Sequence, residues 1–404
     1  MTQEASDTPD APRRLAIFGA TGTIGDNALD LVARHPQRFS VAVLTAQRST
    51  DKLAELARRF QPELLVIGDA AGADALHAAL PDFAGEILVG VDGLKQAATF
   101  DVDVALMAIV GFAGLEPALV CAAQGGLLAL ANKEALVAAG PLLMQTAQQH
   151  GTRILPVDSE HNAIYQLLGD RLLGDGVLGD GASADAKSID KIVLTASGGP
   201  FRALNLEEMA AVTPQQATAH PNWDMGAKIS VDSATMMNKG LELIEAHHLF
   251  AVAPQKLDAL VHKQSIVHGL VYFNDGSVLA QKGSPDMRVP LAYCMAYPQR
   301  IETGVAPLDL AALGRLDFEA VDRQRFPCLA LAEAAMRQGG LMPSVLNAAN
   351  EIAVAAFLEG RIKFTAIAEI VDRVLQAYTP SGDESLQAIL QADAEARRLA
   401  DEAK

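Results

Sequence analysis

The sequence predicts an α/β protein with three domains: an N-terminal domain built on a parallel sheet, a central α+β domain and a C-terminal helical domain. Three observations support this prediction. Short apolar runs alternate with helical patterns at first, strand and hairpin patterns follow, and helical periodicity dominates from residue 308. With 404 residues, the chain is too long for one ordinary hydrophobic core. We expect domains at 1–157, 158–307 and 308–404.

The N-terminal domain is predicted from apolar strands that alternate with helices, the pattern of βαβ units. Helices are expected at 27–34 and at about 51–60, with further helical segments between the later strands. The expected strands are 14–18, 39–44, 64–67, 86–89, 104–107, 127–129 and 153–157.

The pattern changes after a Gly/Asp/Ala-rich stretch at 169–186, which we interpret as a surface insertion without chemistry. Strands are expected at 192–194, 266–273 and 278–281, the last two joined by a turn at 274–276. A long loop rich in polar residues is expected between the first two of these strands. A charged helix at 386–403 is expected to end the chain.

Composition and charge exclude several classes of protein. Half of the residues are hydrophobic and a fifth are charged, as in globular proteins. The net charge of −17 disfavours nucleic acid and anionic membranes as partners, so an anionic substrate would need a local basic pocket. The N-terminal segment lacks the apolar core of a signal peptide, and the longest apolar run, 105–115, is too short to span a bilayer.

The cysteines indicate in which redox compartment the protein works. Cys121, Cys294 and Cys328 are odd in number and far apart, so they suggest buried thiols instead of a disulfide framework or a metal motif. Free thiols suit a reducing compartment, and we expect a cytoplasmic protein.

A glycine-rich segment, GATGTIG at 19–25, lies between the first strand and the first helix. Glycines there permit a tight turn and bring backbone N–H groups close to a pyrophosphate at the helix N-terminus. The spacing is GxxGxxG instead of the commoner GxGxxG, and an ordinary glycine-rich turn is the alternative. Strand, loop and helix follow in the order that a Rossmann-like dinucleotide-binding domain requires.

The second strand is followed by Gln47, Arg48 and Ser49, where an NAD-binding domain would carry an acidic residue. A cation with small polar donors suits a 2′-phosphate, which favours NADPH over NADH. A solvated arginine in a turn is the alternative.

Carboxylates in two distant segments form a candidate metal site. Asp158 and Glu160 are two residues apart at a strand end, where both side chains would point the same way. Glu242 is the third candidate, and three carboxylates without sulfur favour Mg²⁺ or Mn²⁺. A helix-capping aspartate and a surface glutamate are the alternative interpretation of the first two.

Donors suited to a phosphate accompany these carboxylates. The polar loop 220–226 holds the only tryptophan, Trp223, and could close as a lid over a substrate; a tryptophan that fills a gap in the core is the alternative. Lys133 follows a strand at the edge where α/β sites collect, although a surface lysine is equally compatible. The phosphate donors are Ser197, Gly198, Gly199, Ser230, Ser233, Asn238 and Lys239.

Five segments carry a resemblance to a known family. They are ANKEALV (131–137), LPVDSEHNAIYQ (155–166), SGGPF (197–201), HPNWDMGAKISVDSATMMNKGLELIEA (220–246) and LNAANEIAVAAF (346–357). In these segments the chain resembles 1-deoxy-D-xylulose 5-phosphate reductoisomerases, and the similarity runs from the glycine-rich loop to the last helices. The segment 220–246 is the most specific.

The resemblance implies an NADP-dependent oxidoreductase of non-mevalonate isoprenoid precursor biosynthesis. It would use NADPH and Mn²⁺ or Mg²⁺ to rearrange 1-deoxy-D-xylulose 5-phosphate and reduce the product to 2-C-methyl-D-erythritol 4-phosphate. The resemblance further implies a homodimer, a divalent ion in each active site, and three domains that bind NADPH, carry out catalysis and form a C-terminal helical region.

The same resemblance implies roles for individual residues. Catalytic residues would be Lys133, Asp158, Glu160 and Glu242, of which Asp158, Glu160 and Glu242 would bind the metal. Substrate contacts would be Lys133, Ser159, Glu160, Ser197, His220, Trp223, Ser233, Asn238, Lys239 and Glu242. Cofactor contacts would be Thr21, Gly22, Thr23, Ile24, Gln47, Arg48, Ser49, Asn132, Glu134 and Gly226.

The chain departs from the family pattern in two places, and its residues argue against two rival functions. Lys263 stands where the family has proline, and Gln47-Arg48-Ser49 replaces Gly-Lys-Asn, which bears on the strength of the NADPH preference. A semialdehyde-type dehydrogenase would need a nucleophilic cysteine in a recognisable turn, which this chain lacks. An inactive nucleotide sensor would be expected to have lost some metal carboxylates or phosphate donors, and here all are present.

Overall fold

The structure, a computed structural model, describes residues 11–173, 188–220, 223, 225–380 and 382–404. The chain forms two compact units, each assembled from separate segments. Unit 1 comprises Met1–Asn132, Thr146–Asp158 and Met287–Val305, and unit 2 comprises Lys133–Gln145, Ser159–Asp286 and Ala306–Lys404. The predicted domain boundaries after residues 157 and 307 stay a prediction. Residues 174–187 of the predicted surface insertion lie outside the described residues.

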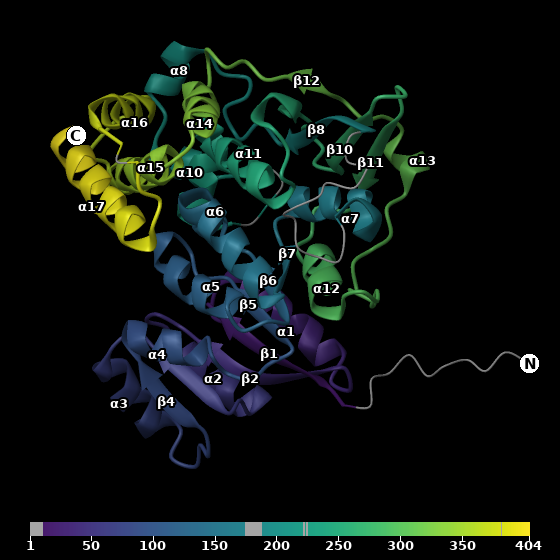
Figure 1. The fold of residues 1–404 in the computed structure, drawn as a ribbon, viewed down its shortest axis with the longest axis vertical. Helices are drawn as coiled ribbons and strands as arrows, with labels where there is room; N and C mark the ends of the chain where they lie inside the picture. The colour runs from purple at the N-terminus through teal and green to yellow at the C-terminus, as the bar shows by residue number, and fades with distance from the viewer. Residues whose placement is uncertain (1–10, 174–187, 221–222, 224, 381) are drawn as a thin grey trace, which may run out of the picture. The chain divides into compact units, whose positions relative to one another are not determined.

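Unit 1 is built on a seven-stranded sheet of order β4-β3-β2-β1-β5-β6-β7, in which all neighbouring strands are parallel (Figure 1). This confirms the predicted parallel-sheet domain. The strands are β1 (Arg13–Phe18), β2 (Phe39–Thr45), β3 (Leu64–Ile67), β4 (Glu86–Val89), β5 (Val104–Met107), β6 (Leu127–Leu130) and β7 (Arg153–Pro156). The strand order reverses between β1 and β5, the point where ligands bind in such sheets.

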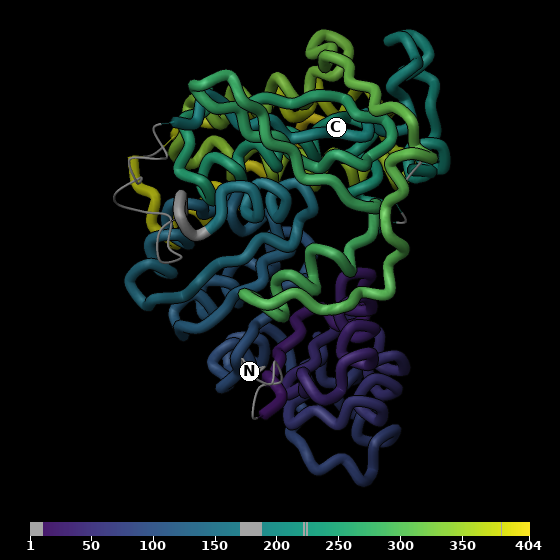
Figure 2. The backbone as a smooth tube through the Cα atoms, turned by 90° about the vertical axis from the view of Figure 1, so that its right-hand side faces the viewer, coloured from purple at the N-terminus to yellow at the C-terminus, as the bar shows by residue number. Residues whose placement is uncertain are grey.

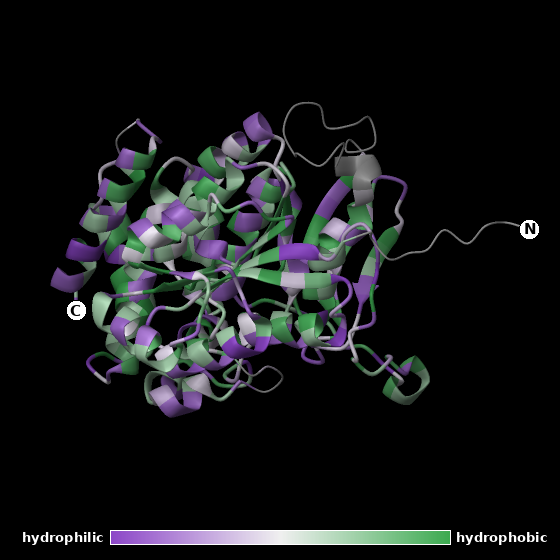
Figure 3. Ribbon diagram, turned by 90° about the horizontal axis from the view of Figure 1, so that it is seen from below, coloured by the Kyte–Doolittle hydropathy of each residue, from purple (hydrophilic) through white to green (hydrophobic). Residues whose placement is uncertain are grey.

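Helices connect these strands by crossovers that are right-handed in nearly all proteins, which places α1–α3 on one face of the sheet and α4 and α5 on the other. Because the sheet is covered on both faces, its strands are almost continuously apolar: Ile17, Leu44 and Val104 are all fully buried. In Figure 3 the strands at the centre of the view are mostly green, whereas green and purple residues alternate along the helices. The helices are α1 (Thr23–Arg34), α2 (Thr50–Phe60), α3 (Ala70–Ala79), α4 (Gly90–Ala97), η1 (Phe112–Gly114), α5 (Leu115–Ala122) and α6 (Lys133–His150), the last of which runs from unit 2 into unit 1.

A late segment of the chain completes unit 1. Helix α12 (Arg288–Ala296) packs against α1, β6 and β7, and Figure 2 shows this green segment beside the N-terminal part of the chain. The Cys294 thiol lies 3.3 Å from the carbonyl oxygen of Pro156. Arg13 donates to the carbonyl oxygen of Tyr297 at 2.8 Å, and Arg153 donates to the Tyr297 hydroxyl at 2.5 Å.

Unit 2 contains a mixed five-stranded sheet of order β11-β10-β8-β9-β12, in which only β8 and β9 pair in parallel. Helix α7 (Ser159–Leu173) packs against β10 and β11, and α11 (Met237–Leu249) packs against β8 and β9. The strands are β8 (Ile189–Ala196), β9 (Leu257–Val261), β10 (Val267–Phe273), β11 (Val278–Lys282) and β12 (Glu319–Ala320).

The predicted C-terminal helices are present: α13 (Leu310–Leu313), α14 (Pro327–Gln338), α15 (Met342–Leu358), α16 (Ala366–Ala377) and α17 (Leu386–Glu402). Of these, α14, α16 and α17 pack against α15. No helix among the described residues is long and apolar enough to cross a membrane.

The prediction of a long loop between residues 194 and 266 is wrong, because the described residues of this stretch form four α-helices, a short 3₁₀ helix and a strand. They are α8 (Leu206–Ala210), α9 (Pro214–Thr218), α10 (Ala227–Thr235), α11, η3 (Pro254–Lys256) and β9. The buried faces of α10 and α11 include Ser230, Asp232, Lys239 and Glu242, so these helices lack the apolar periodicity by which a helix is recognised. Met236 separates the two helices in a left-handed conformation, with φ of 62°.

Candidate active site

The candidate metal carboxylates are positioned by the starts and faces of helices. Strand β7 ends at Pro156 and α7 begins at Ser159, so Glu160 lies in the first turn of a helix. The predicted reason for the pairing, alternation at a strand end, is therefore wrong for Glu160. Asp158 directly precedes α7, so the chain itself holds it beside this turn.

These carboxylates come together although Glu242 is far away in sequence. Asp158, Glu160 and Glu242 each offer an oxygen, and the three oxygens lie within 4.8 Å of one another. Glu242 lies on α11 with its side chain 1 % exposed. A cluster of hard oxygen donors at this spacing fits Mg²⁺ or Mn²⁺.

Two lysines border the carboxylates. The Lys239 ammonium bonds both Glu160 Oε1, at 2.7 Å, and Glu242 Oε2. The Lys133 ammonium, at the start of α6, lies 3.2 Å from Glu242 Oε1 and donates to Asn238 Oδ1 at 2.9 Å. Lys133 is 7 % exposed, so its predicted place in the site is favoured over the surface alternative. Asn238 also donates to Glu242, and Ser159 donates to Glu160.

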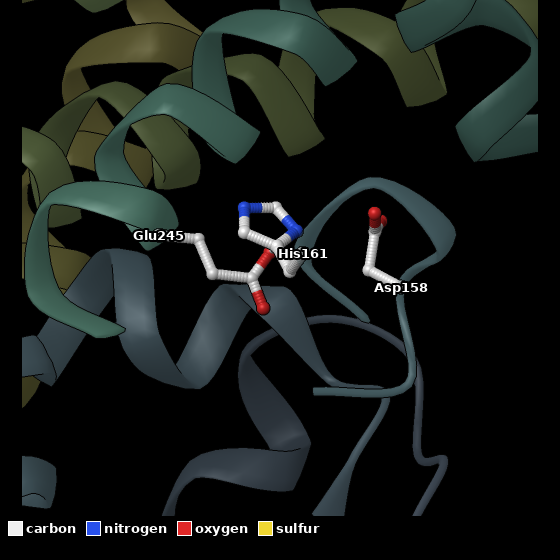
Figure 4. Close-up of side chains that lie close together, drawn as sticks. All are labelled: Asp158, His161 and Glu245. Carbon is white, nitrogen blue, oxygen red and sulfur yellow. The ribbon is translucent and has the colours of Figure 1, made fainter. Parts of the chain in front are cut away.

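A second buried pair lies behind this cluster and was missed in the sequence. His161 Nδ1 lies 3.4 Å from Glu245 Oε2, and His161 Nε2 lies 2.8 Å from the carbonyl oxygen of Glu242. Figure 4 shows Glu245 beside the His161 ring and Asp158 on the loop before α7. Asp158, His161 and Glu245 form a second group with metal-ligand spacing. The sequence offered one sign of this pair: His161 directly follows the segment Asp158–Glu160. No role was predicted for it.

The Ser197 turn follows β8 and is held by His220. The backbone N–H of Trp223 donates to His220 Nδ1 at 3.0 Å, so the ring hydrogen is on Nε2, which lies 2.8 Å from Ser197 Oγ. Burial, and next the charge of Arg202, lowers the pKa of His220 to about 4, so the ring is neutral at pH 7. Ser197 Oγ also accepts from the Gly199 N–H at 3.1 Å.

Gly199 brings this turn against α10. Its φ is +65°, and a Cβ there would lie 2.7 Å from the carbonyl oxygen of Ser233. Only glycine therefore permits this close approach. Ser233 is on α10, and Asn238 and Lys239 are in the first turn of α11, so all the predicted phosphate donors belong to adjoining elements of unit 2.

Trp223 is half-buried and lies near a histidine that the sequence analysis did not single out. The ring centroids of Trp223 and His268 are 6.4 Å apart. Residues 221, 222 and 224 of the predicted lid loop lie outside the described residues. Gly226 ends this loop as the N-cap of α10, and its carbonyl accepts from Ser230 at 3.0 Å.

In unit 1, the glycine-rich loop has the geometry of a dinucleotide-binding turn. Gly19 has φ of +86°, and a Cβ there would lie 2.6 Å from the carbonyl oxygen of Ala108. Gly22 is the N-cap of α1, and Thr23 and Ile24 lie in the first turn of this helix. Thr21 accepts from Lys52 at 3.1 Å through its carbonyl oxygen. Lys52 is a cation beside this loop that the sequence analysis missed.

A cavity of about 220 Å³ opens after β2 and β3. It includes Gln47 and Arg48, and Ser49 adjoins it as the N-cap of α2. Asp69 also lines it, although its carboxylate accepts from the Gly72 N–H at 2.8 Å and caps α3. The full lining is Gln47, Arg48, Thr50, Ile67, Asp69, Ala71, Gly72 and Ala75.

Two of the remaining predicted cofactor residues are buried. The Asn132 amide donates to the carbonyl oxygens of Ile109 and Gly111, at 2.6 and 2.8 Å, and so holds the turn after β5. Glu134, in unit 2, accepts from Lys228 at 2.9 Å. Burial opposes the charge of Glu134, but the Lys228 ammonium overrides this effect and lowers its pKa.

Comparison with known proteins identifies the family. Three family models match successive parts of the chain: 1-deoxy-D-xylulose 5-phosphate reductoisomerase at residues 15–140, its C-terminal domain at 154–250, and the DXP reductoisomerase C-terminal domain at 283–399. The 1-deoxy-D-xylulose 5-phosphate reductoisomerase of Ralstonia nicotianae is 53% identical over 96% of this chain and 97% of its own. That of Aromatoleum aromaticum is 51% identical over 97% and 96%.

Solved structures agree with the sequence comparison. The reductoisomerase from Zymomonas mobilis in complex with NADPH has a TM-score of 0.88 and 46% identity, covering 98% of this chain and 99% of its own. A reductoisomerase in complex with NADPH, fosmidomycin and magnesium has a TM-score of 0.91 and 44% identity, covering 97% and 98%. The chain therefore belongs to the 1-deoxy-D-xylulose 5-phosphate reductoisomerase family.

Proposed function

We propose that this protein uses NADPH and a divalent metal ion to rearrange 1-deoxy-D-xylulose 5-phosphate and reduce the product to 2-C-methyl-D-erythritol 4-phosphate, a step of isoprenoid precursor biosynthesis. The observation that carries the proposal is the cluster of Asp158, Glu160 and Glu242 bordered by Lys133 and Lys239. It combines ligands for a hard cation with cationic groups for an anionic substrate.

Asp158, Glu160 and Glu242 would hold the metal ion. When bound there, a divalent cation supplies a Lewis acid that polarises a carbonyl and stabilises a neighbouring alkoxide. The buried surroundings of Glu242 keep these carboxylates in place, because its oxygens accept from Lys133, Lys239 and Asn238. Mn²⁺ and Mg²⁺ both suit this set of oxygen ligands.

Lys133 is placed to act on an oxygen of the substrate. Its ammonium lies 3.2 Å from Glu242 Oε1, so a substrate oxygen beside the carboxylates falls within its reach. We assign it to donate a hydrogen bond or a proton to this oxygen. Ser159, which hydrogen-bonds Glu160, would contact the substrate backbone.

The substrate phosphate would bind away from the reacting carbons. Ser197 accepts from His220 and from the Gly199 N–H, so its own hydroxyl hydrogen is oriented to donate to a phosphate oxygen. Ser233 and Asn238 add neutral donors, and Lys239 can exchange a carboxylate partner for the phosphate. Trp223 would cover the substrate and exclude water, so that binding energy at the phosphate aids catalysis.

NADPH would bind to the glycine-rich loop at Thr21, Gly22, Thr23 and Ile24, with its 2′-phosphate at Gln47, Arg48 and Ser49. Arg48 supplies the cation for this phosphate at the cavity after β2. Asn132, Glu134 and Gly226 would complete the cofactor contacts.

Assembly and location complete the proposal. A homodimer is supported by β11, an edge strand on which Val278 and Leu279 are 43 % and 47 % exposed, because such an edge can pair with a second copy. A cytoplasmic location is supported by Cys121, Cys294 and Cys328, which are buried and unbridged.

The experiment that tests this function follows NADPH absorbance in the presence of 1-deoxy-D-xylulose 5-phosphate, with Mn²⁺ or Mg²⁺ and with or without a chelator. Loss of NADPH that requires the ketose phosphate and stops on chelation supports reaction, cofactor and metal together. Folded protein that binds NADPH but consumes none would contradict the proposal and favour a nucleotide sensor.

A further inference from the structure

A chain of partly and fully buried charges in unit 2 connects the start of α6 to α10. The Lys228 ammonium lies 2.9 Å from Glu134 Oε1 and 2.9 Å from Asp232 Oδ2. The carboxylates are 7 % and 1 % exposed. Burial opposes the charge on Lys228, but Asp232 and Glu134 outweigh it and raise its pKa above the usual value. Lys228 is therefore a fixed cation between two helices.

The chain of charges continues to the C-terminal helix. Asp232 Oδ1 accepts from Asn350 on α15 at 2.8 Å. The negative charge of the next residue, Glu351, also raises the pKa of Lys228. Glu351 Oε2 accepts from Arg397 Nη2 on α17 at 2.6 Å. Arg397 also bonds both oxygens of Asp393, at 2.7 and 3.0 Å, so its guanidinium is held in a fixed orientation.

These contacts determine how the cations are shared among the carboxylates. Glu351 is close enough to attract Lys228, but Arg397 already neutralises it. Lys228 is thus left to Glu134 and Asp232. Without Arg397, Glu351 would keep only a neutral donor, Asn347 at 3.2 Å, and would compete for the Lys228 ammonium and draw it from Glu134, because a largely buried carboxylate is costly without a cation.

We propose that Lys228 and Arg397 are positioning residues that act through Glu134 on the binding of NADPH. The inference rests on the proposed function, in which Glu134 contacts the cofactor. It gives the C-terminal helix a specific part in cofactor affinity. The donors assigned to the substrate phosphate do not belong to this chain of charges, so the KM for the ketose phosphate should be unaffected.

Adjacent arginines on α17 supply a matched control. Arg398 pairs with Glu395 and Glu402 on the same helix, and its side chain is 52 % exposed. Arg397→Met and Arg398→Met therefore remove the same group from neighbouring positions. Only Arg397→Met removes the bond to Glu351, the carboxylate whose charge acts on Lys228.

The test measures the Kd of NADPH by fluorescence titration and steady-state kinetics on the full-length protein, with thermal unfolding as a control for folding. Lys228→Met should weaken NADPH binding about tenfold or more, Lys228→Arg should restore most of it, and Arg397→Met should weaken it about threefold. Arg398→Met should bind as the wild type. An unchanged Kd in folded Lys228→Met or in Arg397→Met would overturn the inference, as would an equal rise in the KM for the ketose phosphate.

A double variant separates positioning from general loosening. If Arg397 acts by occupying Glu351, then Arg397→Met combined with Glu351→Gln should regain NADPH affinity relative to Arg397→Met alone. An additive further loss would overturn the inference. A wild-type protein that fails to bind or consume NADPH would instead reject the proposed function.

Discussion

Replacing Glu242 with glutamine tests the metal site most directly. The change removes one negative charge and keeps the size of the side chain. In the structure, the Glu242 carboxylate accepts from Lys133 at 3.2 Å and also from Lys239 and Asn238. Glutamine retains one oxygen acceptor, so part of this network survives.

The magnitude for stability follows from these partners. Removing one partner of a buried ion pair costs about 3–5 kcal/mol when the other is left unpaired. Lys239 still has Glu160 at 2.7 Å, and Lys133 still has Asn238 at 2.9 Å. We therefore expect a loss of only about 1–2 kcal/mol in the free energy of unfolding.

The magnitude for activity is larger. Changes in residues that merely support metal ligands lower metal affinity or activity about 10–100-fold. Loss of a ligand itself should lower turnover by about 100-fold or more at fixed Mg²⁺, with partial recovery at high Mg²⁺. NADPH consumption measures turnover, and urea unfolding measures stability.

Glu333→Gln is the matched control. Glu333 is also largely buried, with its side chain 12 % exposed, and it pairs with Arg323 at 2.7 Å. The Glu333→Gln variant should lose about as much free energy of unfolding as Glu242→Gln and should keep the turnover of the wild type. Turnover of Glu242→Gln at the wild-type level, at the same metal concentration, would refute the assignment of Glu242 as a metal ligand.

Three further predictions concern the cofactor, the glycine-rich loop and pH. Arg48→Gln should raise the KM for NADPH about tenfold and leave that for NADH unchanged, because only NADPH carries the 2′-phosphate; equal effects on both cofactors in steady-state assays would contradict this role. Gly19→Ala should lower unfolding stability in urea by about 2–4 kcal/mol, since its Cβ would lie 2.6 Å from a backbone oxygen at φ of +86°. Gly276→Ala has the same φ with open space and should cost only about 1 kcal/mol; equal losses would contradict the clash. Burial lowers the pKa of His248 to about 4, so its contribution to stability is complete above pH 6.5 and is lost as pH falls towards 4. His248→Asn should flatten urea-derived stability over this range, and an unchanged slope would contradict the assignment.

The sheet of unit 1 was predictable because its signal is local. Strands such as 64–67 and 104–107 are apolar throughout and lie between helices, which is what burial on both faces of a parallel sheet demands. The glycine-rich loop was equally predictable, because Gly19 must adopt a positive φ beside a neighbouring strand.

The site helices were not predictable by the same means. Helices α10 and α11 bury charged and polar side chains such as Asp232 and Glu242, so hydrophobic periodicity conceals them. Their partners are remote in sequence, as Lys133 is from Glu242, and the composition of either segment gives no sign of the other. The residue types alone favoured part of the site, such as the Asp158 and Glu160 pair, but the individual roles came from the family resemblance and stay a prediction.

The discontinuity of unit 1 has a consequence for synthesis on the ribosome. Helix α12, which packs against α1, β6 and β7, emerges only after residues 159–286 have been made. Until then, the apolar surface that α12 covers remains open in the nascent chain, and the N-terminal unit cannot complete its core. A nascent chain whose synthesis pauses before residue 305 would therefore expose apolar surface and be prone to aggregation. We expect chaperones that bind nascent chains to act in this interval.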